Sequence, residues 1–285
     1  MSVRIFAPAK INLTLRVGRP RADGLHPLQS VVMFADVGDW IEALPAHDLS
    51  LDIRGPFASE LIADDSNLVL RAARVLALAA SVAPRAKLVL EKNLPIASGM
   101  GGGSSDAAAT LKALNVLWEL GFAEAELARI ACDIGADVPV CVVGRSSWMT
   151  GLGETLAPMQ APVLHAVLAN PLRPLATAAV FREFDRMRLA RALSESSAPV
   201  WRTPAEMWVG AAMMGNDLAA PARALMPEIA EIEALLHAHP RVVHAGLSGS
   251  GATVFGLVET REAAEAVAAD LAHSVRWIRA AVLGA

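Results

Sequence analysis

The chain has 285 residues, of which 54% are hydrophobic and 19% charged, with a formal net charge of −4 at pH 7. At roughly 150 residues per domain this length predicts two domains or one large one, and the composition excludes a disordered chain. The slight negative charge offers no polycation for nucleic acid or an anionic membrane. Arg71 and Arg74 interrupt the longest aliphatic stretch, and no signal-peptide pattern opens the sequence. We therefore expect a cytoplasmic protein with no nucleic acid or membrane partner.

The N-terminal part has the pattern of a sheet. Apolar and polar residues alternate over 11–17, a period of two that gives a strand two distinct faces. After a turn signal at 23–24, apolar runs at 30–37 and 40–44 predict two further strands.

Helical spacing follows. Apolar residues at three- and four-residue steps predict a helix over 66–80 with Ser66 as N-cap. A short strand is expected at 87–91, and helices with apolar stripes are expected over 107–118 and 124–134. Both cysteines, Cys132 and Cys141, lie in apolar segments and are expected in the core.

In the second half of the chain, predicted strands and predicted helices follow one another in a different order. Strands are predicted at 163–169, 242–245, 252–258 and 275–283. Helices are predicted at 177–192, 204–214, 227–239 and 262–273. This is the split βαββαβ order with extra helices in the first crossover. We expect an α+β protein with two domains, 1–155 and 156–285.

The most informative segment is PIASGMGGGSSD at residues 95–106, which places four glycines directly before a helix. Such a loop can turn its backbone N–H groups toward an anion, and the helix N-terminus adds about half a positive charge. A plain helix entry capped by Ser104 or Ser105 is the simpler alternative, but a turn needs only one glycine. The loop matches neither a Walker A loop nor a dinucleotide fingerprint, so we expect another kind of phosphate loop.

Several other polar residues each allow two interpretations. The GLSGSG segment at 246–251 either closes on the same anion or is an ordinary strand connection. Lys10 lies on a predicted strand face that is either solvated or faces a polar ligand. Asp137, in GADVP, is either a turn or N-cap residue or a general base, and beside Lys10 it would suit phosphoryl transfer to an alcohol. His26 is either an exposed loop residue without a functional contact or a contact to a flat ring. Phe181 is either a core residue that anchors its helix or a contact to such a ring.

Six segments together resemble the GHMP small-molecule kinases. They are PAKINLTL, RADGLHPLQSVV, NLPIASGMGGGSSDAAA, GADVPV, GLGE and GLSGSGA, and they span nearly the whole chain. The first two are most similar to members that phosphorylate a cytidine-diphosphate-linked methylerythritol in non-mevalonate isoprenoid synthesis. The resemblance implies a two-domain α+β fold, with a ribosomal-S5-type N-terminal domain, a ferredoxin-like C-terminal domain, and ATP and substrate meeting in the cleft.

The resemblance also implies roles for individual residues. Asp137 would be the base toward the substrate's 2-hydroxyl and Lys10 its electrostatic partner, with Asn67 near the adenine pocket. The ATP phosphate loop would consist of Pro95, Ile96, Ala97, Ser98, Gly99, Met100, Gly101, Gly102, Gly103, Ser104 and Ser105. The substrate would be held by Asn12, His26, Thr177 and Phe181, with His26 on the cytosine edge and Phe181 on its face. The loop beside the transferred phosphate would be Ser248, Gly249, Ser250 and Gly251. Mg²⁺ would accompany ATP, held mainly by phosphate oxygens and waters.

One departure from the family pattern concerns the substrate pocket. Members usually have Tyr before the loop histidine, whereas this chain has Leu25 and no Tyr. One pocket wall is then aliphatic, which loses about 0.5–1.5 kcal/mol of ring contact.

Two other functions are weighed against this one. A GHMP kinase for homoserine or mevalonate is expected to lack the His26 and Phe181 pair. A ligand-binding regulator that has lost catalysis is disfavoured by the retention of Lys10 and Asp137. No feature of the sequence specifies an oligomeric state.

Overall fold

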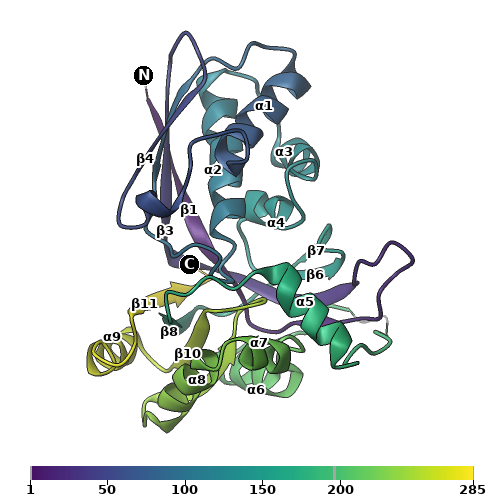
Figure 1. The fold of residues 1–285 in the computed structure, drawn as a ribbon, viewed down its shortest axis with the longest axis vertical. Coiled ribbons are helices and arrows are strands. Elements are labelled where there is room, and N and C mark those ends of the chain that lie inside the picture. Colours follow the sequence, from purple (N-terminus) through teal and green to yellow (C-terminus); the bar gives the residue numbers. More distant parts are fainter. Residues whose placement is uncertain (1, 195–196, 285) are drawn as a thin grey trace. The chain divides into compact units, whose positions relative to one another are not determined.

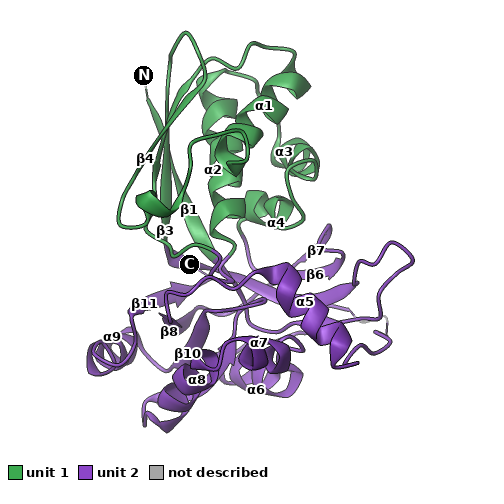
Figure 2. Ribbon diagram, in the orientation of Figure 1, with its two compact units in different colours: residues 1–9, 38–96, 101–144 green, residues 10–37, 97–100, 145–285 purple. Residues whose placement is uncertain are grey.

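The computed structural model describes residues 2–194 and 197–284 and divides the chain into two compact units. Unit 1 comprises Met1–Ala9, Gly38–Ile96 and Gly101–Gly144, and unit 2 comprises Lys10–Val37, Ala97–Met100 and Arg145–Ala285 (Figures 1 and 2). The units alternate along the chain because the strands β1 (Val3–Asn12) and β3 (Leu28–Leu44) each begin in one unit and end in the other.

Unit 1 is a small sheet with helices on one face (Figure 1). Its strands are β4 (Ser50–Arg54), parallel to β5 (Lys87–Glu91), which pairs antiparallel with the C-terminal part of β3. A 3₁₀ turn, η1 (Ala58–Glu60), precedes the helices α1 (Leu68–Ala80), α2 (Gly102–Leu117), α3 (Glu124–Ala131) and α4 (Val138–Val143). Helix α2 packs against α1 and α4, and four of its nine buried residues are alanines, which let neighbouring helices approach closely.

Unit 2 contains an antiparallel sheet in the order β11-β8-β10-β9. These strands are β8 (Leu164–Asn170), β9 (Val242–Leu247), β10 (Val254–Val258) and β11 (Trp277–Leu283), and the helices α8 (Glu228–Ala238) and α9 (Arg261–Asp270) pack against them. Taken as strands one to four, they have the order 4-1-3-2, the ferredoxin-like arrangement predicted by the split βαββαβ pattern. Three further helices, α5 (Thr177–Arg186), α6 (Pro204–Met214) and α7 (Ala219–Leu225), lie in the first crossover. The remaining strands are β2 (Arg16–Val17), β6 (Ser147–Gly151) and β7 (Thr155–Pro158).

Two strands predicted separately, at 30–37 and 40–44, are parts of the single strand β3. Gly38 lies between the two predicted strands, and a glycine in the interior of a strand usually weakens it. In the structure Gly38 instead allows a close approach, because a Cβ there would overlap the carbonyl oxygen of Ala7 on β1.

Some predicted helix limits are also wrong. Asn67, not Ser66, caps α1, since its side chain accepts a hydrogen bond from Val69 N at 3.0 Å. Helix α5 ends at Arg186 rather than at 192, and α3 ends at Ala131. The short helix α7 was not predicted at all. Cys132, expected in the core, is exposed just past the end of α3.

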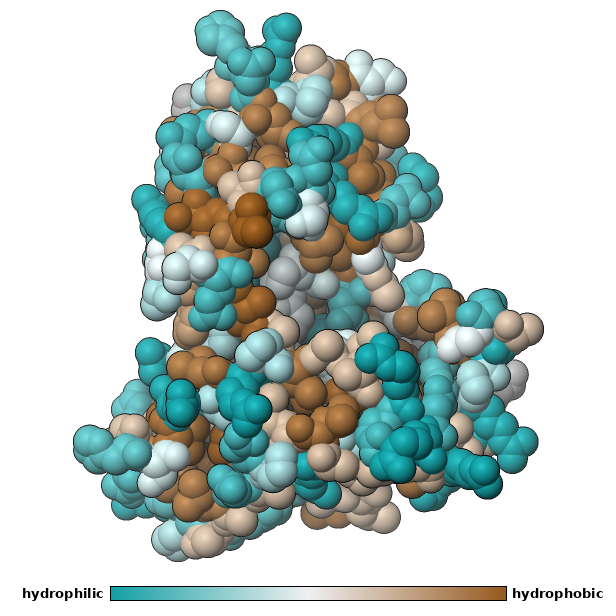
Figure 3. Space-filling model, viewed as in Figure 1, coloured by the Kyte–Doolittle hydropathy of each residue, from teal (hydrophilic) through white to brown (hydrophobic). Residues whose placement is uncertain are grey.

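The surface mixes hydrophilic and apolar residues, and in the view of Figure 3 the apolar ones form small patches among the hydrophilic ones. Leu78 in unit 1 and Met213 in unit 2 are among the exposed large apolar side chains. Isolated apolar side chains on a surface are ordinary in globular proteins. Among the described helices, none has both the length and the apolarity needed to cross a bilayer.

Candidate active site

The end of β1 carries two buried polar residues. Lys10 and Asn12 are each 3% exposed, so the solvated strand face considered for Lys10 is wrong. The side chain of Asn12 donates to Ser30 Oγ at 2.7 Å, and its backbone N donates to Ser248 Oγ at 3.2 Å. Because burying polar groups costs free energy unless they are partnered, their placement here indicates a built polar site.

The glycine-rich loop is divided between the units, and its residues 97–100 belong to unit 2. Each of the four carbonyl oxygens there accepts a hydrogen bond. The donors are Leu175 N to Ala97 O at 3.5 Å, Thr253 N to Ser98 O at 2.9 Å, Ser248 Oγ to Gly99 O at 2.9 Å and Lys10 N to Met100 O at 2.8 Å. With its carbonyls held in this way, the loop can present N–H groups to an anion, as the sequence predicts.

The second glycine-rich loop lies against the first within unit 2. A Cβ at Gly99, whose φ is +77°, would come within 2.5 Å of Ser248 O, and a Cβ at Gly249 would come within 3.2 Å of Gly99 O. Thr177 Oγ1 and Ser250 Oγ lie 2.9 Å apart, so a predicted substrate residue and a predicted phosphate residue are in contact. Residues 246–251 therefore pack against the first glycine-rich loop, and their contact with the same anion stays a prediction.

The first turn of α2 lies in unit 1 and continues the glycine-rich loop. Its N-cap is Gly101 in the left-handed conformation with φ +61°, and Ser104 and Ser105 lie inside the helix. The expected alternative of a serine cap is therefore wrong. The opening N–H groups of a helix have no acceptor within it, which leaves this turn suited to an anion.

Behind this turn, unit 1 contains a buried ionic triad of Lys92, Asp39 and Asp106. Lys92 Nζ lies 2.6 Å from Asp39 Oδ2 and 2.7 Å from Asp106 Oδ2, and all three side chains are buried. Burial raises the pKa of Asp106 to about 8, against the opposing attraction of Lys92. Burial alone would lower the pKa of Lys92, but Asp106 and Asp39 together raise it above its ordinary value.

The triad fixes the orientation of the phosphate-loop helix. Asp39 Oδ1 also accepts hydrogen bonds from Asn93 N at 2.5 Å and Leu94 N at 2.8 Å. A Cβ at Gly102 would lie 3.0 Å from Lys92 Nζ, so the glycine leaves room for the ammonium group. Sequence reasoning missed this triad, although Lys92 and Asp106 flank the glycine-rich loop.

The two ring residues proposed for the cytosine are neighbours in unit 2. The ring centroids of His26 and Phe181 are 5.4 Å apart, with 37° between their planes. His26 is buried and its Nδ1–H donates to Gly18 O at 2.8 Å, so it is not the exposed loop residue considered as an alternative. Its Nε2 lies 3.3 Å from a carboxylate oxygen of Asp185, four residues after Phe181 on α5. That helical spacing was a signal that could have identified Asp185.

The remaining predicted residues lie in unit 1. Asn67 uses its side chain at the start of α1, where Nδ2 also donates to Ile62 O at 3.1 Å. Asp137 occupies the N-cap position of α4, although its carboxylate makes no capping hydrogen bond to the helix, and its role as a base stays a prediction. Lys10 belongs to unit 2 and Asp137 to unit 1, and their catalytic pairing stays a prediction.

Two family models match the chain. The model for the GHMP kinases N terminal domain matches residues 67–145, and the model for the GHMP kinases C terminal region matches residues 178–275. The domain boundary predicted at residue 155 falls between the matched segments and stays a prediction. The two models lie on either side of residues 146–177.

Individual proteins are similar over nearly the full length. A 4-diphosphocytidyl-2-C-methyl-D-erythritol kinase of Cereibacter sphaeroides is 49% identical over 280 residues, covering 97% of each chain. One of Parvibaculum lavamentivorans is 46% identical over 281 residues, covering 98% of this chain and 97% of that protein. A solved 4-(cytidine 5'-diphospho)-2C-methyl-D-erythritol kinase has a TM-score of 0.79 at 32% identity and covers 99% of each chain.

A homoserine kinase from Cytophaga hutchinsonii shares the fold alone, with a TM-score of 0.71 at 16% identity, covering 99% of this chain and 94% of that one. The fold class and the resemblance predicted from the sequence are thus confirmed. On its two family models and its near full-length relatives, the chain belongs to the GHMP kinases.

Proposed function

We propose that the protein is an ATP-dependent kinase that phosphorylates the 2-hydroxyl of 4-diphosphocytidyl-2-C-methyl-D-erythritol, a step of non-mevalonate isoprenoid precursor synthesis. Membership of this kinase family implies ATP as co-substrate. The observation that carries the proposal is the near full-length similarity, at 49% identity, to a kinase named for this substrate. Because both reactants are metabolites, the proposal places the enzyme in the cytoplasm with a small molecule as its partner.

The ring pair supports recognition of a cytidine group. The half-buried ring of Phe181 offers an apolar face, and the buried imidazole of His26 is held in orientation through Gly18 O. A nucleobase needs one stacking face and a few fixed polar groups at its edge. The Thr177 hydroxyl and the Asn12 side chain add polar groups from the same unit.

The chemistry requires a base and a cation at the acceptor hydroxyl. We propose that Asp137 accepts the proton of the 2-hydroxyl as the hydroxyl oxygen attacks the γ-phosphorus of ATP, while the bond from the γ-phosphorus to the bridging oxygen breaks and ADP leaves. Lys10 neutralises charge developing on the transferred group. The backbone amides of the two glycine-rich loops would hold the phosphates in place. Asn67 would lie near the adenine.

Mg²⁺ requires oxygen ligands and usually keeps waters and substrate phosphates among them. In residues 2–194 and 197–284 no group of three His, Cys, Asp or Glu side chains could hold a metal ion. Ser105 Oγ and Asp106 Oδ1 in the first turns of α2 are buried and have no hydrogen-bond partner within the same residues. These oxygens fit a cation that is otherwise held by ATP phosphates, and we propose them as its protein contacts. When bound, Mg²⁺ neutralises charge on the phosphate oxygens.

The reaction is tested with a coupled ADP-release assay on the cytidine-linked alcohol, free methylerythritol, homoserine and mevalonate. The expected result is turnover with the cytidine-linked alcohol alone. Turnover with homoserine or mevalonate instead would assign the chain to another GHMP kinase activity, and ATP binding without transfer to any of them would make it a regulator.

The base is tested with Asp137→Asn. This variant should bind ATP as the wild type does, because the change removes a proton acceptor and no phosphate ligand. It should lose turnover by at least about 100-fold, the low end of what a general base contributes. Wild-type turnover in this variant would refute the role of Asp137.

A further inference from the structure

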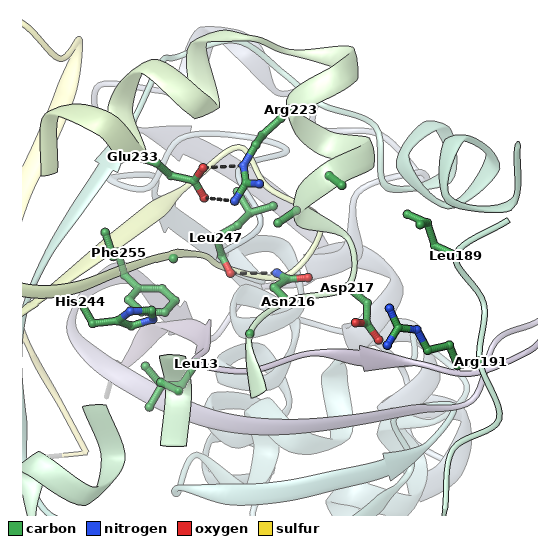
Figure 4. Close-up of a pocket in the computed structure, with 16 residues that line it drawn as sticks. Leu13, Leu189, Arg191, Asn216, Asp217, Arg223, Glu233, His244, Leu247 and Phe255 are labelled. Atoms are coloured by element: carbon green, nitrogen blue, oxygen red, sulfur yellow. Dashed lines mark hydrogen bonds and ion pairs between the residues drawn. The ribbon is translucent and has the colours of Figure 1, made fainter. Parts of the chain in front are cut away.

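A loop that receives a phosphate must keep its carbonyl oxygens turned away from the anion, because like partial charges repel. In the predicted phosphate-proximal loop, a side chain outside every predicted motif provides this restraint. Asn216, in the connection between α6 and α7, donates from Nδ2 to Leu247 O and to Gly249 O, each at 2.8 Å (Figure 4 shows the first bond). The amide thus binds the loop from one side at two points.

Asn216 is itself held firmly within unit 2. Its Oδ1 accepts a hydrogen bond from Leu218 N at 2.8 Å. The backbone on either side pairs with Leu15, through Leu15 N to Gly215 O at 2.9 Å and Asp217 N to Leu15 O at 2.8 Å. An amide whose polar atoms are all engaged has one orientation, so it holds the loop in one conformation.

The loop's own bonds complete the arrangement. Ser248 N donates to Thr253 O at 2.9 Å, and Gly251 N donates to Ser248 O at 3.0 Å. The amides of Gly249 and Ser250 have no acceptor among the residues that the structure describes. Successive N–H groups without an acceptor, next to a glycine with φ +58°, form a concavity suited to an anion.

We propose that Asn216 is a positioning residue for phosphoryl transfer: by holding the carbonyls of Leu247 and Gly249, it keeps the amides of Gly249 and Ser250 directed at the transferred phosphate. This inference rests on the proposed function. Asn216 does not contact the reacting atoms in this assignment. It acts by holding the loop carbonyls in place, as the four donors described above hold the carbonyls of residues 97–100 in unit 2.

Glu233 offers a matched control variant for Asn216. Asn216 and Glu233 both line a space of about 350 Å³ in unit 2 (Figure 4). Glu233 is bound to Arg223 at 2.6 Å and has no bond to the loop. Glu233→Gln therefore perturbs the surroundings of Asn216 without releasing either loop carbonyl.

The experiment compares Asn216→Ala, Asn216→Asp and Glu233→Gln with the wild type in steady-state kinetics, together with thermal unfolding of each. Alanine removes both donors, and aspartate keeps the shape but offers no donor when ionised. Both variants should lower kcat by about 100-fold, the cost of a small misplacement at a reacting centre. The KM for the cytidine-linked substrate should change much less than kcat, because neither His26 nor Phe181, the residues assigned to the base, contacts Asn216. Glu233→Gln should keep the wild-type kcat even if its Tm falls.

Three outcomes would overturn the proposal. The first is a wild-type kcat in Asn216→Ala. The second is a raised KM for the cytidine-linked substrate in Asn216→Ala at unchanged kcat. The third is that Glu233→Gln loses as much kcat as Asn216→Ala when it also loses as much Tm. The last would mean that Asn216 contributes only to folding. A wild-type enzyme inactive on the cytidine-linked alcohol would instead refute the proposed function itself, so the two failures are distinguishable.

Discussion

Leu25 shows how a single side chain can bear on substrate affinity without touching the chemistry. It precedes the buried His26, is 53% exposed, and replaces the tyrosine usual in the resembling family. In the proposed site the stacking contact to the base would therefore come from Phe181, without a second aromatic wall at position 25. The sequence was sufficient to propose His26, because it lies in the segment RADGLHPLQSVV, and the assignment of His26 and Phe181 to the substrate stays a prediction. It could not reveal Asp185 or Asn216, whose roles depend on partners 159 residues away for Asp185 and 31 and 33 residues away for Asn216.

Leu25→Tyr should lower the KM for the cytidine-linked substrate by about 2- to 10-fold, because an aromatic partner adds about 0.5–1.5 kcal/mol of ring contact. The value of kcat should stay as in the wild type. Steady-state kinetics at saturating ATP provides the measurement, with Phe181→Leu as the opposite change, which should raise the same KM. An unchanged KM in both variants would show that these side chains do not contact the substrate.

At the level of elements, α2 owes its position to ionic contacts as much as to packing. Its buried face is mostly small or polar, with Leu111 and Leu114 as its larger apolar side chains, and the Lys92 triad ties its first turns to β3 and to the residue after β5. The glycines before α2 were readable as a phosphate loop because their spacing is local. The Lys92 triad could not be predicted from the sequence, because its three residues lie in separate segments that only the folded structure brings together. The two predicted strands merge into β3 for the same reason. A glycine is needed at position 38 because Ala7 on β1 comes close to it, and the residues next to Gly38 in the sequence do not reveal this.

The triad predicts a pH-dependent stability. In the folded state the pKa of Asp106 is raised to about 8, whereas an unfolded aspartate has a pKa of about 3.9. Between these values the folded protein binds one more proton at this site, so the free energy of unfolding should fall as pH rises, by at most about 1.4 kcal/mol per pH unit. Asp106→Asn should remove this part of the slope, because an amide does not titrate.

This is measured by denaturant unfolding between about pH 5 and 7.5, a window inside the two pKa values, with neither ATP nor Mg²⁺ present. Asp65→Asn is the control, since Asp65 pairs with Arg74 at an exposed position and should leave the slope as it is. Equal slopes in Asp106→Asn and the wild type would show that Asp106 is ionised throughout.

For the whole molecule, nucleotide binding should appear as added stability. A ligand that binds only the folded state at 100 times its Kd adds about 2.7 kcal/mol to the free energy of unfolding. A non-hydrolysable ATP analogue with Mg²⁺ should therefore raise Tm by several degrees. Gly99→Ala should abolish that rise, because the added Cβ would come within 2.5 Å of Ser248 O at a φ of +77°.

Differential scanning fluorimetry of both proteins, with and without the analogue, tests this. Gly24→Ala serves as the control, since Gly24 also has a positive φ of +80° but a Cβ there would meet nothing within 4 Å. It should lower Tm without reducing the ligand-induced rise. A full rise in Gly99→Ala would separate the loop from nucleotide binding.

The chain passes between its two compact units five times, since their six segments alternate along it. No single cut of the gene can release either unit intact, because a fragment that begins near residue 145 lacks the segments 10–37 and 97–100 of unit 2, and a fragment that ends there carries these segments without the rest of unit 2. Such a protein cannot be assembled by exchanging one half for that of a relative at a simple junction. Recombination would have to replace several short stretches together, which favours change by point substitution over shuffling of modules.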